Sequence, residues 1–163
     1  MSDLKPISGE AIPHALQKVE RYRLLNEPAE AESICRDVLR TDPGNQRALV
    51  MLLLTLTDQF GRGTSVNDAR ALLERIEGGY ERAYYGGIIS ERQGKAQLRT
   101  GTPGSKSNAH HWIQEAMVAY ERAEALRPAG NDDAILRWNA CARLLRDREL
   151  APRPEDLIEH PIE

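Results

Sequence analysis

The chain has 163 residues, of which 40% are hydrophobic and only 5% aromatic, and its formal net charge is -3. This length suits one compact domain, and the scarcity of aromatic side chains favours packed helices over a β-sandwich. The slightly negative charge, with both signs interspersed, argues against a surface that binds nucleic acid. The two cysteines, Cys35 and Cys141, are too few for a disulfide framework or a cysteine metal cluster. Without a secretion signal or a membrane-length apolar stretch, the sequence predicts a cytoplasmic protein.

Hydrophobic periodicity predicts seven helices and an all-α fold. Residues 1–9 are expected to be a flexible lead-in, because Pro6 and Gly9 interrupt any period. The predicted helices span about 10–25, 28–41, 45–60, 65–77, 80–93, 109–127 and 132–147. In the fifth helix, Gly86 and Gly87 lack side chains, which indicates that another helix approaches closely there.

Two stretches are expected to be irregular. Residues 95–108 pass into a run of Gly, Pro, Ser and Thr, which predicts one long loop. Residues 148–163 contain prolines and several acidic residues, which predicts an extended acidic tail. The tail carboxylates are expected to be solvated, although the tail could instead occupy the protein's own groove; they are Glu155, Asp156, Glu159 and Glu163.

A spaced pattern of residues recurs in the helix pairs. Two sets of three residues have the same spacing along the chain. The early set is Ala31, Cys35 and Pro43, and the late set is Ala116, Tyr120 and Pro128. The pattern resembles the tetratricopeptide repeat (TPR), a helix-turn-helix unit of about 34 residues. The resemblance is weaker in the middle unit, where Gly78 and Gly79 stand in place of the terminating proline. The positions that carry the resemblance are Tyr22, Ala31, Cys35, Pro43, Ala69, Leu73, Gly87, Ala116, Tyr120, Ala123 and Pro128.

The resemblance implies an α-solenoid over residues 10–147, with about three helix pairs and a closing helix in a right-handed superhelical stack. In this family the first helix of each pair lines a concave groove that holds a peptide or helix of a partner protein. Core packing is the alternative for Leu54 and Ile88, and Tyr84 could be core or groove wall. The groove residues that the resemblance implies are Leu16, Glu20, Arg23, Arg47, Val50, Leu54, Thr57, Glu81, Tyr84, Ile88 and Glu91.

The sequence therefore predicts a non-enzymatic scaffold or adaptor that binds another protein, without a cofactor, a metal, nucleic acid or a membrane. The alternative is a structural subunit that self-associates through its end helices, so a monomer or a weak homo-oligomer is expected. A remote alternative is an enzyme that uses His110, His111 and Glu115.

The segment from Gly101 to Ser107 superficially resembles a phosphate-binding loop. It lacks the glycine before Lys106 and the preceding strand that such a loop needs. A flexible surface loop is therefore expected there.

Overall fold

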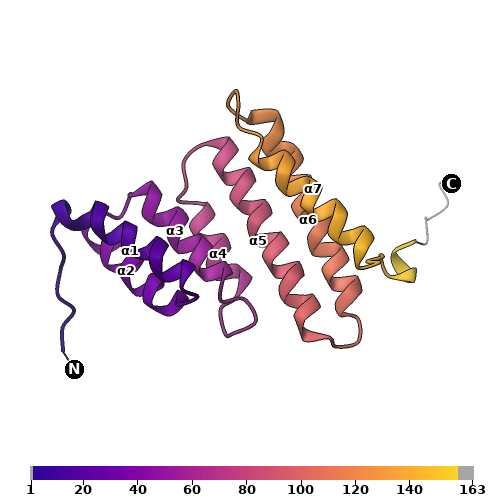
Figure 1. Cartoon of the computed structure of the whole chain (residues 1–163), viewed down its shortest axis with the longest axis horizontal. Helices are drawn as coiled ribbons and strands as arrows, with labels where there is room; N and C mark the ends of the chain where they lie inside the picture. The colour runs from indigo at the N-terminus through magenta and orange to yellow at the C-terminus, as the bar shows by residue number, and fades with distance from the viewer. Residues whose placement is uncertain (1, 158–163) are drawn as a thin grey trace. The chain divides into compact units, whose positions relative to one another are not determined.

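The computed structural model describes residues 2–157, which form seven α-helices and two short 3-10 turns and contain no β-strand (Figure 1). The all-α fold predicted from the sequence is confirmed. Within this described part of the chain, no helix is both long and apolar enough to cross a bilayer. The helices are α1 (Ile12–Leu24), α2 (Pro28–Thr41), α3 (Gln46–Thr57), α4 (Val66–Leu73), α5 (Gly79–Thr100), α6 (Ser105–Leu126) and α7 (Asp133–Asp147), and the turns are η1 (Gly9–Ala11) and η2 (Pro154–Leu157).

The chain divides into two compact units, Met1–Gly78 and Gly79–Glu163, called unit 1 and unit 2 below. The repeat pattern predicts a single helical domain over residues 10–147 and does not predict the division after Gly78. Each unit has its own buried core.

Unit 1 is built around α3, which packs against both α2 and α4 and also contacts α1. Four leucines of α3 are buried because the helix is apolar over most of its circumference; they are Leu49, Leu52, Leu53 and Leu56. The turn between α1 and α2 is short because Asn26 adopts a φ of 59°, a left-handed conformation that asparagine tolerates. Side-chain caps start the later helices: Asn45 Oδ1 accepts from Ala48 N at 2.9 Å, and Ser65 and Asp68 form a capping box.

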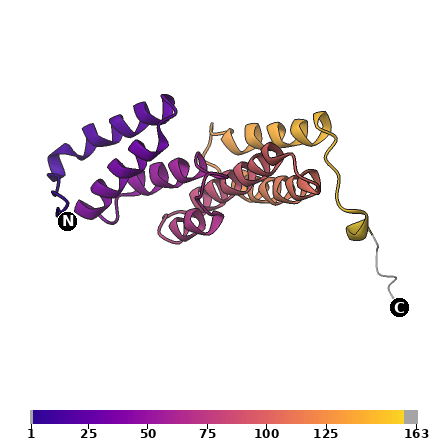
Figure 2. The same cartoon turned by 90° about the horizontal axis from the view of Figure 1, so that it is seen from below.

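Unit 2 is a long hairpin of α5 and α6 with α7 packed against α6, as two perpendicular views show (Figure 1, Figure 2). The hairpin is tight because glycines on α5 face large side chains of α6. A Cβ on Gly87 would lie 2.5 Å from Tyr120 Cε1, and one on Gly94 would lie 2.9 Å from Ile113 Cδ1. Of the two glycines at which a close helix approach is predicted, Gly86 and Gly87, the approach is present at Gly87.

The predicted long loop over 95–108 is wrong. Helix α5 continues to Thr100 and α6 begins at Ser105, so only residues 101–104 connect the two helices. Gly94, which directly follows the predicted fifth helix over 80–93, is buried inside α5, where its missing side chain makes room for α6. Packing against α6 offsets the cost of about 1 kcal/mol that a glycine brings to a helix interior.

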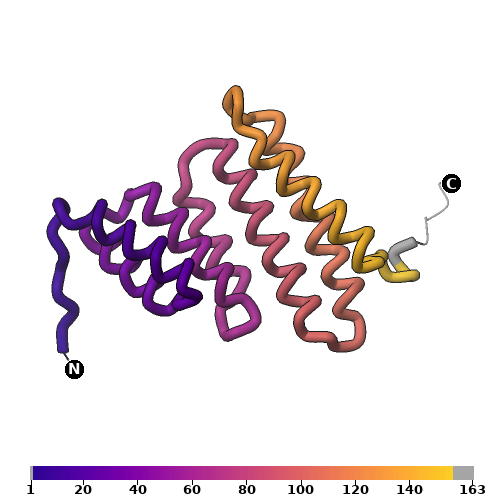
Figure 3. Tube along the Cα trace, viewed as in Figure 1, coloured from indigo at the N-terminus to yellow at the C-terminus, as the bar shows by residue number. Residues whose placement is uncertain are grey.

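The two ends of the described chain are less regular. Residues 2–8 form no helix, as expected for the lead-in, although Thr41 Oγ1 donates to the carbonyl of Ile7 at 3.1 Å. Beyond α7 the chain packs through the buried Leu150 and reaches η2 (Figure 3). Glu159 and Glu163 of the predicted acidic tail lie outside the described residues.

Glu91 is the buried charge of unit 2. Its side chain is only 1% exposed, and it joins α5 to α6 and α7. Arg137 of α7 contacts both carboxylate oxygens, with Nε 3.2 Å from Oε1 and Nη2 bonded to Oε2. Tyr120 Oη donates to Oε1 at 3.3 Å, Cys141 Sγ lies 3.2 Å from Oε1, and Lys95 Nζ lies 3.0 Å from Oε2. One carboxylate thus holds three helices together.

The charged form of Glu91 is favoured in the folded protein. Burial by itself raises the pKa of this carboxyl group, but hydrogen bonds from Arg137 and Lys95 and their positive charges outweigh it, and the pKa falls below the ordinary 4.5. Because the folded pKa is the lower one, the stabilisation is complete above pH 4.5 and is lost as the pH falls through the folded value.

We predict that Gly87→Ala lowers the free energy of unfolding by about 1 kcal/mol or more, although alanine is the better helix former. The added Cβ would collide with the Tyr120 ring, which is fully buried and cannot move aside cheaply. Urea denaturation measures the change. Gly79→Ala is the control in the same helix, because its Cβ would make an ordinary 3.4 Å contact with Leu126. An equally destabilised control would contradict the packing account.

Glu91→Gln is expected to lower the free energy of unfolding at neutral pH by about 3 kcal/mol, because Arg137 loses its buried partner. The variant should also lose part of the acid sensitivity, so its stability should fall less than that of the parent protein below pH 4.5. Denaturation across the acid range measures both effects. Glu74→Gln, at an exposed glutamate, is the control; parallel pH profiles for parent and Glu91→Gln would refute the role of this carboxylate.

Candidate partner-binding site

A hollow of about 400 Å³ lies on unit 1 between α1 and α3. Two of the predicted groove residues, Glu20 and Arg23, line it. The remaining lining residues are Leu24, Met51 and Asp58. In the repeat that the sequence resembles, α1 and α3 correspond to the first helices of two successive pairs.

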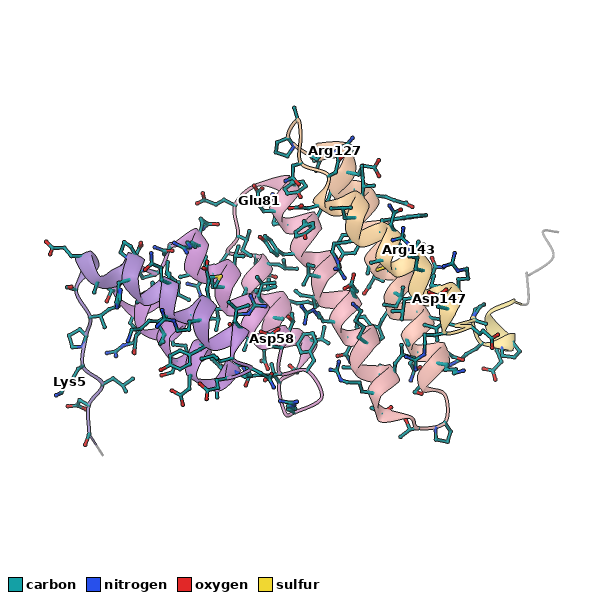
Figure 4. All side chains as sticks on the ribbon, viewed as in Figure 1. Lys5, Asp58, Glu81, Arg127, Arg143 and Asp147 are labelled. Atoms are coloured by element: carbon teal, nitrogen blue, oxygen red, sulfur yellow. The ribbon has the colours of Figure 1, made fainter. Side chains whose placement is uncertain are left out.

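Two ion pairs cross this hollow from α1 to α3. Near the start of α3, Arg47 Nη2 lies 2.9 Å from Glu20 Oε1, and both side chains are about half exposed. Just after the end of α3, Arg23 Nε donates to Asp58 Oδ2 at 2.7 Å and Nη2 donates to Oδ1 at 3.3 Å. Asp58 is labelled in Figure 4.

The two pairs differ in strength. Arg23 and Asp58 are only 21% and 19% exposed and meet in a two-pronged contact, which is the stronger geometry for an arginine and a carboxylate. The exposed Glu20–Arg47 pair is screened by water and contributes about 1 kcal/mol or less. The Arg23–Asp58 pair therefore fixes α1 against α3, whereas Glu20 and Arg47 can exchange partners.

Leu24 gives the hollow an apolar side. It is the last residue of α1 and is 88% exposed, so its side chain is available for contact. Met51 forms part of the hollow from α3, with most of its side chain buried. The lining thus combines apolar contact with charges of both signs.

Four predicted groove residues have their side chains buried and present little or no surface. Leu16 and Thr57 are buried in unit 1, and Thr57 Oγ1 donates to the carbonyl of Leu54 at 2.7 Å. Ile88 and Glu91 are buried residues of unit 2. Position within a repeat indicates which way a side chain faces only approximately, so these four serve packing.

The other predicted groove residues keep accessible surface. Val50 and Leu54 are half-buried, and Arg47 and Glu81 are exposed. Tyr84 is half-buried in a cluster of tyrosines, with its ring centroid 5.9 Å from that of Tyr120. Burial raises the pKa of Tyr84 to about 12, so its hydroxyl is neutral at physiological pH.

Three residues that line the hollow are absent from the groove residues predicted from the sequence. For two of them the sequence contains a pattern that could have identified them. Leu24 follows Glu20 by four positions and Met51 follows Arg47 by four, a spacing that places each pair on one face of its helix. Asp58 follows directly after α3, and only the structure places it opposite Arg23.

Glu115 and His111, which the enzymatic alternative would use, make contacts within the protein. Glu115 Oε2 accepts a hydrogen bond from Ser90 Oγ at 2.7 Å, and His111 is exposed with its ring edge against Trp112. Burial raises the pKa of the Cys35 thiol to about 12 and also raises that of Cys141, so both thiols remain protonated. Among residues 2–157, no three His, Cys, Asp or Glu side chains are grouped to hold a metal ion.

The repeat-signature positions mostly lie in the two cores. Tyr22 and Leu73 are half-buried, and the two prolines are exposed at helix ends. The buried members are Ala31, Cys35, Ala69, Gly87, Ala116, Tyr120 and Ala123.

Comparison with known proteins gives no relative from which to assign a family. The sequence matches no protein-family model, no curated protein and no solved structure. The hollow between α1 and α3 is therefore interpreted from its own geometry and chemistry.

Proposed function

We propose that this protein is a non-enzymatic interaction module of the TPR type, which binds a segment of another protein in the hollow between α1 and α3. The observation that carries the proposal is the combination of that hollow with the 88% exposed side chain of Leu24. An exposed apolar side chain beside a concave surface offers an anchoring contact, and charged groups at the edge offer a polar rim, which are the two parts of a protein-binding site.

The chemistry of the hollow indicates what kind of segment fits. Leu24 and Met51 offer apolar contact to one anchoring side chain of the partner. Glu20 and Arg47 lie at the edge and form a half-exposed ion pair, so charged groups of a partner can replace that weak pairing. A short peptide or helix with an apolar anchor and charged neighbours of both signs is the complementary ligand.

A second candidate is self-association through α7. Leu136 on this helix is 62% exposed, and Ile135 and Leu145 are only half-buried. These side chains give the last helix an apolar character that a second copy of the chain could cover.

Light scattering across a range of concentrations separates the two candidates. The interaction-module proposal predicts the mass of one chain at all concentrations, because the partner is a different protein. A mass that rises to that of a dimer, and that returns to one chain on Leu136→Lys, would support the assembly role instead. Leu126→Lys, at another exposed leucine of unit 2, is the matched control.

Partner binding is expected to depend on Leu24. A photo-reactive amino acid placed at position 24 should cross-link a segment of the partner, which can then be sequenced and synthesised. Leu24→Lys should weaken binding of that synthetic segment by about tenfold or more, because the apolar anchor loses its contact. Leu25→Lys is the control, at a leucine that is 61% exposed and outside the lining of the hollow. Equal weakening by both variants would contradict the assignment.

The charges at the edge can be tested without loss of their ion pair. The double variant Glu20→Arg, Arg47→Glu keeps two opposite charges facing each other but reverses their positions, so stability should change by less than about 1 kcal/mol. Binding of the segment should weaken, as calorimetry would measure. The matched control reverses Arg146 and Asp147, an exposed ion pair in unit 2, and unchanged binding is expected there.

A further inference from the structure

The start of α6 has backbone donors without acceptors. Gly104 precedes the helix with a φ of 81° and offers no side-chain cap. The N–H of Ser105 bonds to the carbonyl of Thr102, and that of Asn108 bonds to the carbonyl of Gly104, at 3.0 Å each. Within residues 2–157, the N–H groups of Lys106 and Ser107 have no such acceptor. They lie at the positive end of a 22-residue helix.

These donors lie beside a hollow of about 380 Å³ in unit 2. The basic side chains of Lys106 and Arg148 both line it, and none of its lining residues is acidic. Arg148 reaches the hollow from the end of α7, which lies at the same end of unit 2 as the α5–α6 turn (Figure 3). The other lining residues are Leu98, Gly101, Thr102, Gly104, Ser105 and Ser107.

Ser105 is an independent indication of a ligand. It is only 6% exposed and lines the hollow, yet its hydroxyl has no hydrogen-bond partner among the described residues. The hydroxyl oxygen is not fully enclosed, because Tyr80 Oη is the only fully enclosed side-chain oxygen or nitrogen without a partner among the described residues. It therefore stays open to a molecule in the hollow that Ser105 lines. A hydroxyl in this position can donate to an acceptor that enters the hollow.

We propose that this hollow is a binding site for a phosphate group. The residues around the hollow carry several hydrogen-bond donors: two backbone N–H groups, the Ser105 hydroxyl, one ammonium and one guanidinium group. A tetrahedral oxyanion can accept from all of them, and helix starts with nearby Arg and Lys commonly hold phosphate. The source is inorganic phosphate or a small phosphate monoester, since both present the same group.

The site differs from a nucleotide-binding P-loop. Helix α5 precedes the turn, where a P-loop requires a strand, and Lys106 follows Ser105 and not a glycine. The proposal is therefore binding of a phosphate group without hydrolysis. It is independent of the partner-binding site in unit 1.

Titration of the full chain with inorganic phosphate, followed by amide NMR, tests the proposal. The backbone amide signals of Lys106 and Ser107 should shift and saturate, whereas chloride at the same ionic strength should not move them. A parallel titration with phenyl phosphate distinguishes the two sources: tighter binding of this ester indicates a phosphate monoester, and equal or weaker binding indicates inorganic phosphate. Absence of saturable shifts with both, or identical shifts with chloride, overturns the proposal.

Variants make the test specific to these side chains. Lys106→Gln combined with Arg148→Gln should weaken phosphate binding by about tenfold or more, since each residue supplies a charge-assisted contact. Ser105→Ala should weaken it by a smaller factor. The control combines Lys18→Gln with Arg143→Gln, which removes the same charge at two exposed residues; Arg143 is on α7 and is labelled in Figure 4. Equal loss in the control would mean general charge attraction and would overturn the site.

Discussion

The packing of unit 2 depends on one buried carboxylate. Glu91 cannot be charged in an apolar interior unless cations and donors surround it, so Arg137 and Tyr120 must be brought to it from α7 and α6. The same register brings Gly87 under the Tyr120 ring. With the three helices fixed in this way, the end of α7 comes beside the start of α6, where Arg148 lines the hollow that we assign to phosphate.

Unit 1 is stabilised by different means. Its core is apolar, with α3 covered by its neighbouring helices, and its charges lie near the surface. The partly buried Arg23–Asp58 pair links α1 to α3 beside the hollow, while the weaker Glu20–Arg47 pair remains accessible. One side of the hollow is therefore held by the Arg23–Asp58 pair, whereas Glu20 and Arg47 at its edge can form ion pairs with another protein instead. This arrangement suits reversible binding.

Much of the fold could be predicted from the sequence, because helical periodicity depends on residues close together in the chain. The run of Gly, Pro, Ser and Thr over 95–108 gave a wrong prediction of a long loop. Helix α5 instead continues through Gly94, and this depends on a close contact between Gly94 and Ile113 on the next helix. Glu91 was expected in a groove, and its burial depends on Arg137, far away in the sequence. Glu20 and Arg23 could be identified from the repeat pattern, whereas Asp58 acquires its role only by facing Arg23 across the unit. Contacts between distant residues therefore account for the errors.

We propose that the hollow between α1 and α3 receives the partner. The most direct measurement is an amide NMR spectrum of the full chain with and without the partner segment. The account predicts that the shifted signals cluster at the hollow, around Glu20, Leu24, Met51 and Asp58, while α7 is unaffected. Shifts confined to α7, or spread evenly over both units, would contradict it.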